Sequence, residues 1–154
     1  MSAPPDTRGE HTFTIDTRWD DVPNKTLREL ARIWFWESDY EQQTGEPPGP
    51  HPDLDGETGR ETVVRMNFTA GPDPQWRFIE AAVAEASRDD HLLSVAAGPV
   101  EHLLWKHGEA FIGRVEERVA ADPKWRTLIG GVWRHGMSDA VWSRVEALKD
   151  AASG

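Results

Sequence analysis

The chain has 154 residues, the size of one domain with a single core that buries roughly 70% of the surface exposed by the unfolded chain. It contains no cysteine, which excludes disulfide bridges and thiolate metal ligands and fits a reducing compartment. Its 27 acidic and 17 basic residues give a net charge of −10, which repels a phosphate backbone and disfavours direct binding of nucleic acid.

Residues 1–22 are polar and predict a loosely held N-terminal arm. Polar and apolar residues alternate briefly at 12–16, which indicates either a short strand or no regular structure. The first ten residues lack the basic region and apolar run of a signal peptide, and no apolar stretch approaches membrane-spanning length. We therefore expect a cytoplasmic protein that makes no contact with a membrane.

The segment from Asn24 to about Gln42 is predicted to form a helix with two apolar sides. One stripe follows helical spacing and should be buried, and it consists of Leu27, Leu30, Ala31 and Trp34. Successive helical residues turn by about 100°, so a second group must face elsewhere. This group contains Ile33, Trp36 and Tyr40.

Residues 44–60 hold four prolines and four glycines, a composition that sustains neither a helix nor a strand. The region is also acidic, because seven carboxylates and no Lys or Arg lie between Arg32 and Arg60. A loop of this length inside a domain is either disordered or functional. The following residues, 61–70, fit a strand or a helical turn equally well.

Three prolines are predicted to open helices, at positions 74, 99 and 123. Asp73-Pro74 and Asp122-Pro123 each place a capping carboxylate before a proline at the first helical position, and Gly98-Pro99 repeats the scheme with glycine. The helix from Pro99 should end at Gly108, and apolar spacing predicts further helices over 90–97, 109–121, 123–133 and from about Ser138. The sequence thus predicts an all-α fold, a compact irregular bundle of six or seven short helices arranged as hairpins, with one domain over 23–154.

No motif indicates catalysis. His102 and His107 are five residues apart and do not share a helix face as a zinc pair would, and adjacent Glu101 and His102 point about 100° apart. The serines lack the context of a nucleophile, and no glycine-rich phosphate loop is present. We expect no catalytic residue, no metal and no cofactor, although carboxylates from distant segments could still converge.

The eight tryptophans are the unusual feature of the composition. Trp125 and Trp133 share a stripe with Leu128 and Val132 and are predicted to lie in the core. Trp105 falls away from the apolar stripe of its helix, so it contacts either a neighbouring helix or a partner protein. The residues predicted to bind a partner are Trp36, Glu37, Asp39, Tyr40, Glu41 and Trp105, an aromatic anchor with an acidic rim. The alternative for the acidic run is an ordinary solvated or disordered loop.

Residues 96–104 (Ala-Ala-Gly-Pro-Val-Glu-His-Leu-Leu), Lys106-His107-Gly108, Asp122-Pro123 and Gly131-Val132-Trp133 carry a resemblance. Over roughly 74–145 the chain resembles a family of small, acidic, uncharacterised bacterial proteins, a domain of unknown function. It departs from the family pattern at Val100, where the family has Leu, and at His102, where it has Asp. The resemblance implies a bacterial, helical, cytoplasmic protein and no particular activity.

The leading hypothesis is a non-catalytic module that binds a basic protein, in the manner of an immunity protein or inhibitor. Small size, acidity near surplus aromatic residues and the lack of recognisable chemistry all favour it. The alternative is an enzyme or small-molecule sensor with a pocket between helices.

Overall fold

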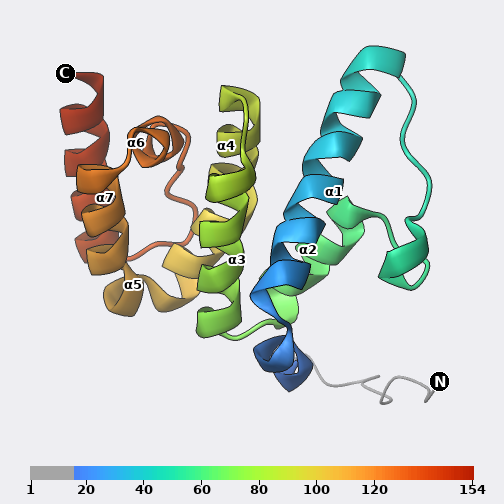
Figure 1. Ribbon diagram of the computed structural model, residues 1–154. Coiled ribbons are helices and arrows are strands. Elements are labelled where there is room, and N and C mark those ends of the chain that lie inside the picture. The colour runs from blue at the N-terminus through green and yellow to red at the C-terminus, as the bar shows by residue number, and fades with distance from the viewer. Residues whose placement is uncertain (1–15) are drawn as a thin grey trace.

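The computed structural model describes residues 16–154, and over this range it contains helices and no strand (Figure 1). Seven α-helices form the domain: α1 (Asn24–Thr44), α2 (Gly59–Thr69), α3 (Pro72–Glu85), α4 (Asp89–Val95), α5 (Glu101–Ala121), α6 (Pro123–Ile129) and α7 (Asp139–Ser153). Two 3-10 helices, η1 (Thr17–Asp21) and η2 (Pro52–Leu54), and a π-helical turn, η3 (Ala96–Val100), complete it. The predicted all-α bundle is confirmed, although α5, with 21 residues, is longer than the short helices expected there.

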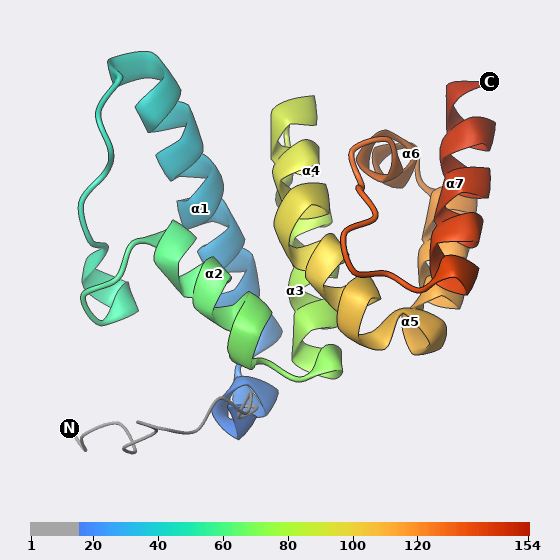
Figure 2. The ribbon, with the colours of Figure 1, turned by 180° about the vertical axis from the view of Figure 1, so that it is seen from behind.

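The helices lie in three groups across the molecule. Helices α1 and α2 form one side, α3 and α4 lie in the middle, and α5, α6 and α7 form the other side (Figures 1 and 2). Helix α1 packs mainly on α3, α4 on α6, and α5 on α7. The core runs through all three groups, and its largest fully buried side chains include Phe78, Leu27, Met66, Ile79 and Leu104.

The described part of the predicted arm, residues 16–22, is packed against the domain. Trp19 is buried, and its indole nitrogen donates to the Thr69 hydroxyl at 2.9 Å. The guanidinium of Arg77 donates to the carbonyl oxygens of Val22, Trp19 and Asp20. The alternation at 12–16 falls almost entirely outside the described residues.

Of residues 61–70, for which the sequence left two possibilities, 61–69 lie in helix α2 and Ala70 follows as its C-cap. Thr58 caps this helix, because its hydroxyl accepts from the Glu61 amide at 3.0 Å. A second cap comes from α1: the Glu37 carboxylate accepts from the amides of Gly59 at 2.7 Å and Arg60 at 3.0 Å. Carboxylates stabilise helix N-termini, where amides lack helical partners. The region predicted as a loop thus ends with the start of α2 at Gly59.

Only one of the three predicted proline starts is confirmed in full. Asp122 caps α6 by accepting from the Lys124 amide at 2.9 Å. Helix α3 begins earlier than predicted, at Pro72, with Gly71 as its N-cap, so Asp73 lies in the first turn. Lys124 also holds the end of α3, since its ammonium group donates to the carbonyl oxygens of Val83, Ala84 and Ala86.

The start predicted at Pro99 is wrong, because α4 runs through the π-helical turn η3 directly into α5 (Figure 2). Proline lacks an amide hydrogen and its ring crowds the preceding turn, and the wider π turn accommodates both features. Next to the end predicted at Gly108, α5 is interrupted by a kink at His107, whose angles are not helical (φ −136°, ψ 28°), and the helix then continues over the predicted 109–121. Gly108 is buried against Val141 of α7 at this point.

Helix α6 is shorter than the predicted 123–133, since it ends at Ile129 before Gly130-Gly131. Trp125 is buried as predicted, but the prediction for Trp133 is wrong because its side chain is 68% exposed. The last helix begins as predicted, with Ser138 accepting from the Val141 amide at 3.2 Å. None of the helices within 16–154 has the length and apolar character needed to cross a membrane.

Candidate functional site

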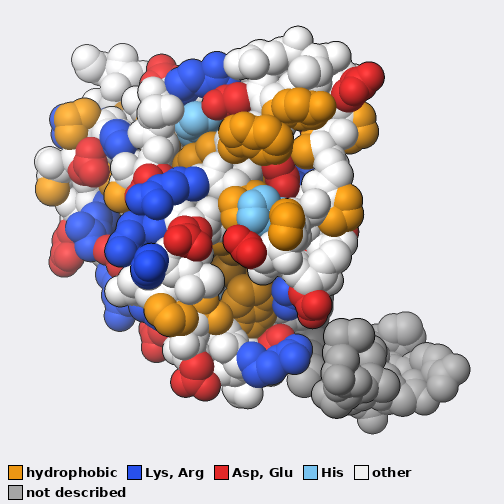
Figure 3. Space-filling view, turned by 45° about the vertical axis from the view of Figure 1, so that its right-hand side comes forward, with side chains coloured by type: hydrophobic (Ala, Val, Ile, Leu, Met, Phe, Trp, Pro, Cys, Tyr) orange, Lys and Arg blue, Asp and Glu red, His pale blue; other side chains and the backbone are white. Residues whose placement is uncertain are grey.

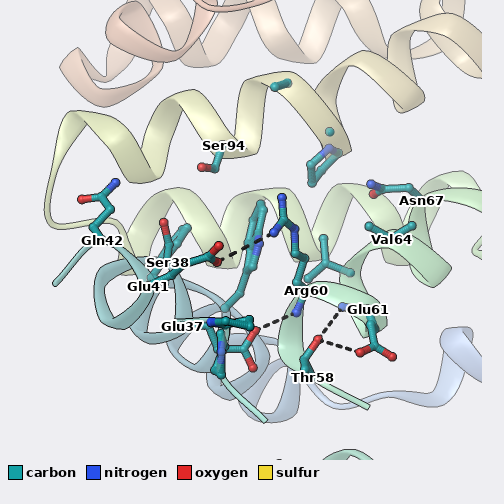
Figure 4. A pocket seen from close by; sticks show the side chains of 18 residues that line it. Glu37, Ser38, Glu41, Gln42, Thr58, Arg60, Glu61, Val64, Asn67 and Ser94 are labelled. Carbon is teal, nitrogen blue, oxygen red and sulfur yellow. Dashed lines mark hydrogen bonds and ion pairs between the residues drawn. The ribbon is translucent and has the colours of Figure 1, made fainter. Parts of the chain in front are cut away.

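A cleft of about 760 Å³ lies between α1, α2 and the junction of α4 with η3 (Figure 4). Helix α1 contributes Trp34, Ser38 and Glu41 to its walls, α2 contributes Arg60, Glu61 and Val64, and the junction contributes Ser94 and residues 97–99. Two prolines that follow α1, Pro47 and Pro48, also line it. This volume falls within the range of roughly 300–1,000 Å³ that is typical of ligand sites.

Acidic side chains outnumber basic ones in this cleft. The carboxylate of Glu37 is already engaged by two amides of α2, whereas Glu41 lies across from Arg60 with 3.9 Å between Oε2 and Nη1 (Figure 4). Exposed ion pairs of this kind contribute about 0–1 kcal/mol, so they exchange readily for other partners. The cleft can therefore accept a positively charged group at Glu41 or Glu61.

A polar layer closes the cleft near η3. The side-chain amide of the buried Gln75 donates to Asn67 Oδ1 at 2.7 Å and to the Pro99 carbonyl at 3.3 Å. The Asn67 side chain extends toward the junction of α4 and α5 (Figure 4). The Gln75 side-chain oxygen is buried and has no hydrogen-bond partner among the described residues. These amides tie α2 and α3 to η3 and give the cleft fixed polar atoms.

The predicted partner-binding residues of α1 separate onto different sides of the helix. Trp36 and Tyr40 stack on the outer side with ring centroids 5.1 Å apart, and Trp36 is 58% exposed. Asp39 is half-buried and bound to Arg88 at 2.8 Å and to His91 at 3.0 Å. Glu41 is exposed, as expected for the rim of a binding surface.

Glu37 differs from the expectation of an exposed acidic rim. It is only 4% exposed, because its carboxylate turns inward to cap α2. Figure 3 shows a face of the molecule on which hydrophobic, acidic and basic side chains are interspersed. The aromatic pair thus remains on the outer side of α1, whereas Glu37 is buried and Asp39 is held in ion pairs.

Trp105 lies far from this group in the fold, on α5, and is 46% exposed. It lines a second pocket of about 420 Å³ together with Ala97, Glu101, His102, His135 and Gly136. The Glu101 carboxylate accepts from the Trp133 amide at 2.9 Å and pairs with His135 Nε2 at 2.7 Å. Burial raises the pKa of Glu101 above its ordinary value, although Trp133 and His135 act in the opposite direction.

Sequence reasoning overlooked the pairing of Glu101 with His135. These residues are 34 positions apart, and only the chain reversal between α6 and α7 brings them together. His135 has a positive φ of 44°, which is uncommon outside glycine and is a signal that the sequence does not carry. In the part of the chain that the structure describes, no three His, Asp or Glu side chains are placed to hold a metal ion.

A family model described as a family of unknown function (DUF6869) matches residues 55–153. The chain belongs to this family. The DUF6869 match includes the whole of the second pocket and only part of the cleft, because α1 precedes it. Neither a curated protein nor a solved structure matches the chain.

Proposed function

We propose that this DUF6869 protein is a non-catalytic cytoplasmic module that binds a basic protein partner, in the manner of an immunity protein or inhibitor. The observation that supports the proposal is the stacked pair Trp36–Tyr40 on the outer side of α1, in which Trp36 is 58% exposed, on a helix that also carries the exposed Glu41. Exposed aromatic clusters with a polar surround are typical of interfaces, and Trp and Tyr are frequent energetic anchors there.

The exposed indole supplies binding free energy. Covering the exposed part of Trp36 removes roughly 100 Å² of largely apolar surface from water. This contributes about 2.5 kcal/mol of hydrophobic free energy, on the order of a single interface hot spot. Because Tyr40 already holds the ring by stacking, little side-chain entropy is lost when a partner covers it.

Charge determines the class of partner. The net charge of −10 is concentrated locally, since Glu41, Glu46, Asp53 and Asp55 all lie in or next to the exposed segment that follows α1. Such a surface attracts basic proteins, accelerates their encounter and disfavours acidic ones. The basic groove of a nucleic-acid enzyme has the complementary charge.

A small-molecule sensor or enzyme is the second candidate, and the cleft of about 760 Å³ with converging polar groups favours it. The two functions differ in which variants matter. Loss of Trp36 should affect only protein binding, whereas Ser38→Trp should fill the cleft and affect only a ligand bound there.

Affinity capture from the native host, followed by titration of the purified partner, tests the proposal. Trp36→Ala should weaken binding about 10- to 100-fold, in line with an interface anchor. Glu41→Lys should slow association, and binding of the unmodified protein should weaken as salt rises. Trp133→Ala is the matched control, because Trp133 is also largely exposed but lies on the α6–α7 side.

The proposal is wrong if the purified partner is acidic, or if Trp36→Ala binds it as tightly as the unmodified protein does. Salt-insensitive binding contradicts the electrostatic part. Circular dichroism and thermal unfolding of each variant must first match those of the unmodified protein, which is expected for substitutions of exposed side chains.

A further inference from the structure

The pocket beside Trp105 lies where the start of α5 faces the segment between α6 and α7. Its volume is about 420 Å³, and both elements contribute to its walls. Gly136 allows this approach, because a Cβ at that position would lie 2.4 Å from the Trp105 indole nitrogen. The segment therefore lies directly against the edge of the indole, which positions the ring.

Glu101 is a buried negative charge in the pocket wall. It is 5% exposed, and its two oxygens are engaged by the Trp133 amide and by His135 Nε2. A carboxylate has about four acceptor sites, so these two contacts leave acceptor capacity on both oxygens. Burial of a carboxylate is costly unless the group is paired. The partner of Glu101 is His135, whose side chain is largely exposed to water.

The lining also includes two aromatic side chains of α5, Trp105 and His102. Trp105 presents an indole whose centroid is 6.1 Å from the His102 ring. His102 Nδ1 is buried and lacks a hydrogen-bond partner among the described residues. Burial lowers the pKa of His102, and the nearby Lys106 and His135 act in the same direction, which favours the neutral imidazole.

Two lysines lie near the pocket, and the ammonium group of each donates to a backbone carbonyl. The Lys106 ammonium group donates to the Asn67 carbonyl at 3.2 Å and lies 5.4 Å from the Phe68 ring centroid and 5.8 Å from that of Trp105. The ammonium group of Lys149 donates to the Val132 carbonyl at 2.7 Å. Neither residue is part of the pocket lining.

We propose that this pocket binds a small organic cation, an alkylammonium or guanidinium group, with Glu101 as the counter-ion and Trp105 as the aromatic wall. A carboxylate beside an indole is a combination that recognises such cations, because the ring face and the carboxylate both attract positive charge. An anion would be repelled by Glu101. The cation comes either from a free amine or from a Lys or Arg side chain of another protein. The inference does not depend on the proposed function, since it involves neither Trp36 nor Tyr40.

Titration of the full ¹⁵N-labelled chain followed by NMR tests the proposal. The probes are n-butylammonium, n-butylguanidinium, 1-butanol and butyrate, at pH 7.5 and constant ionic strength. Saturable shifts of the Trp105 indole N–H and of the Trp133 and Gly136 amides are expected with the two cations alone. A lysine with a blocked backbone, Nα-acetyl-lysine N-methylamide, distinguishes the two sources of the cation. Binding equal to that of n-butylammonium indicates a protein side chain, and absence of binding indicates a free amine.

Two variants test the residues. Glu101→Gln should weaken cation binding at least tenfold, and so should Trp105→Leu, whereas Trp36→Ala should leave it unchanged. If Glu101→Gln fails to fold, Trp105→Leu decides.

The proposal is overturned if neither cation gives saturable shifts, or if 1-butanol binds as well as n-butylammonium. It is also overturned if both folded variants bind as tightly as the unmodified protein. Failure of the Trp36 surface to bind a partner would leave these results unaffected, so the two proposals fail separately.

Discussion

Two glycines in α5 should respond to alanine with opposite signs. A Cβ at Gly108 would lie 2.8 Å and 2.9 Å from the two Cγ atoms of Val141 and 3.3 Å from its Cβ. Rotation of Val141 cannot clear both methyl groups, so α5 and α7 would have to separate. At Gly113 no atom lies within 4 Å of the added Cβ.

The magnitudes follow from these distances. Overpacking of a core costs about 1–3 kcal/mol, and alanine in a helix returns up to about 1 kcal/mol relative to glycine. Gly108→Ala should therefore reduce the free energy of unfolding by about 1–2 kcal/mol, whereas Gly113→Ala should increase it by about 0.5–1 kcal/mol. For a chain of this size each kcal/mol corresponds to a change in Tm of roughly 2–4 °C.

Urea unfolding and thermal unfolding of both variants measure the difference. Val141→Ala introduced into Gly108→Ala should restore part of the lost stability, giving a coupling free energy of at least about 1 kcal/mol between the two sites. A neutral or stabilising effect of Gly108→Ala would refute the close contact of α5 with α7. A destabilising effect of Gly113→Ala would refute the assumption that helix propensity alone acts at that site.

Three further predictions concern buried charges and caps. Glu37→Gln should lower the free energy of unfolding by about 1–2 kcal/mol, because an amide has one acceptor oxygen for two helix N–H groups. As a control, Glu41→Gln at an exposed position should change it by less than about 0.5 kcal/mol. Lys124→Met should lower the free energy of unfolding, measured with urea, by about 2 kcal/mol, because it leaves three carbonyl groups of the α3 terminus without this donor. A decrease no larger than that caused by Lys25→Met at an exposed position would contradict this role. The hydrogen bond from Arg65 holds the pKa of Glu57 below its ordinary value of 4.5, so the folded chain binds this proton more weakly than the unfolded chain does. The resulting stability is present above pH 4.5 and is lost as the pH falls through the lowered pKa. Glu57→Gln should therefore flatten that part of the acid-unfolding profile.

Local signals in the sequence predicted helix boundaries where capping is local. Asp122 and Ser138 cap helices through amides two and three residues away, so their patterns were sufficient. A similar pattern at Gly98-Pro99 gave a wrong prediction of a helix start. Whether a helix begins or continues there depends on the packing around η3. The burial of Asn67 and Gln75 beside that turn is not visible in its sequence.

The candidate sites depended more on long-range contacts. Trp36 and Tyr40 share a helix side, so their pairing followed from spacing alone. The inward turn of Glu37 required knowledge that α2 begins at Gly59, 22 residues later. The exposure of Trp133 required the early end of α6, which its apolar spacing concealed.

Ala97 of the π-helical turn η3 lines both the cleft and the pocket of Glu101. An occupant of one compartment that displaces this residue would alter the volume of the other. We expect the two compartments to communicate, and thermodynamic linkage requires the effect to be equal in both directions. A bulkier side chain at residue 97 would then change the volume of both the cleft and the pocket of Glu101 with a single substitution.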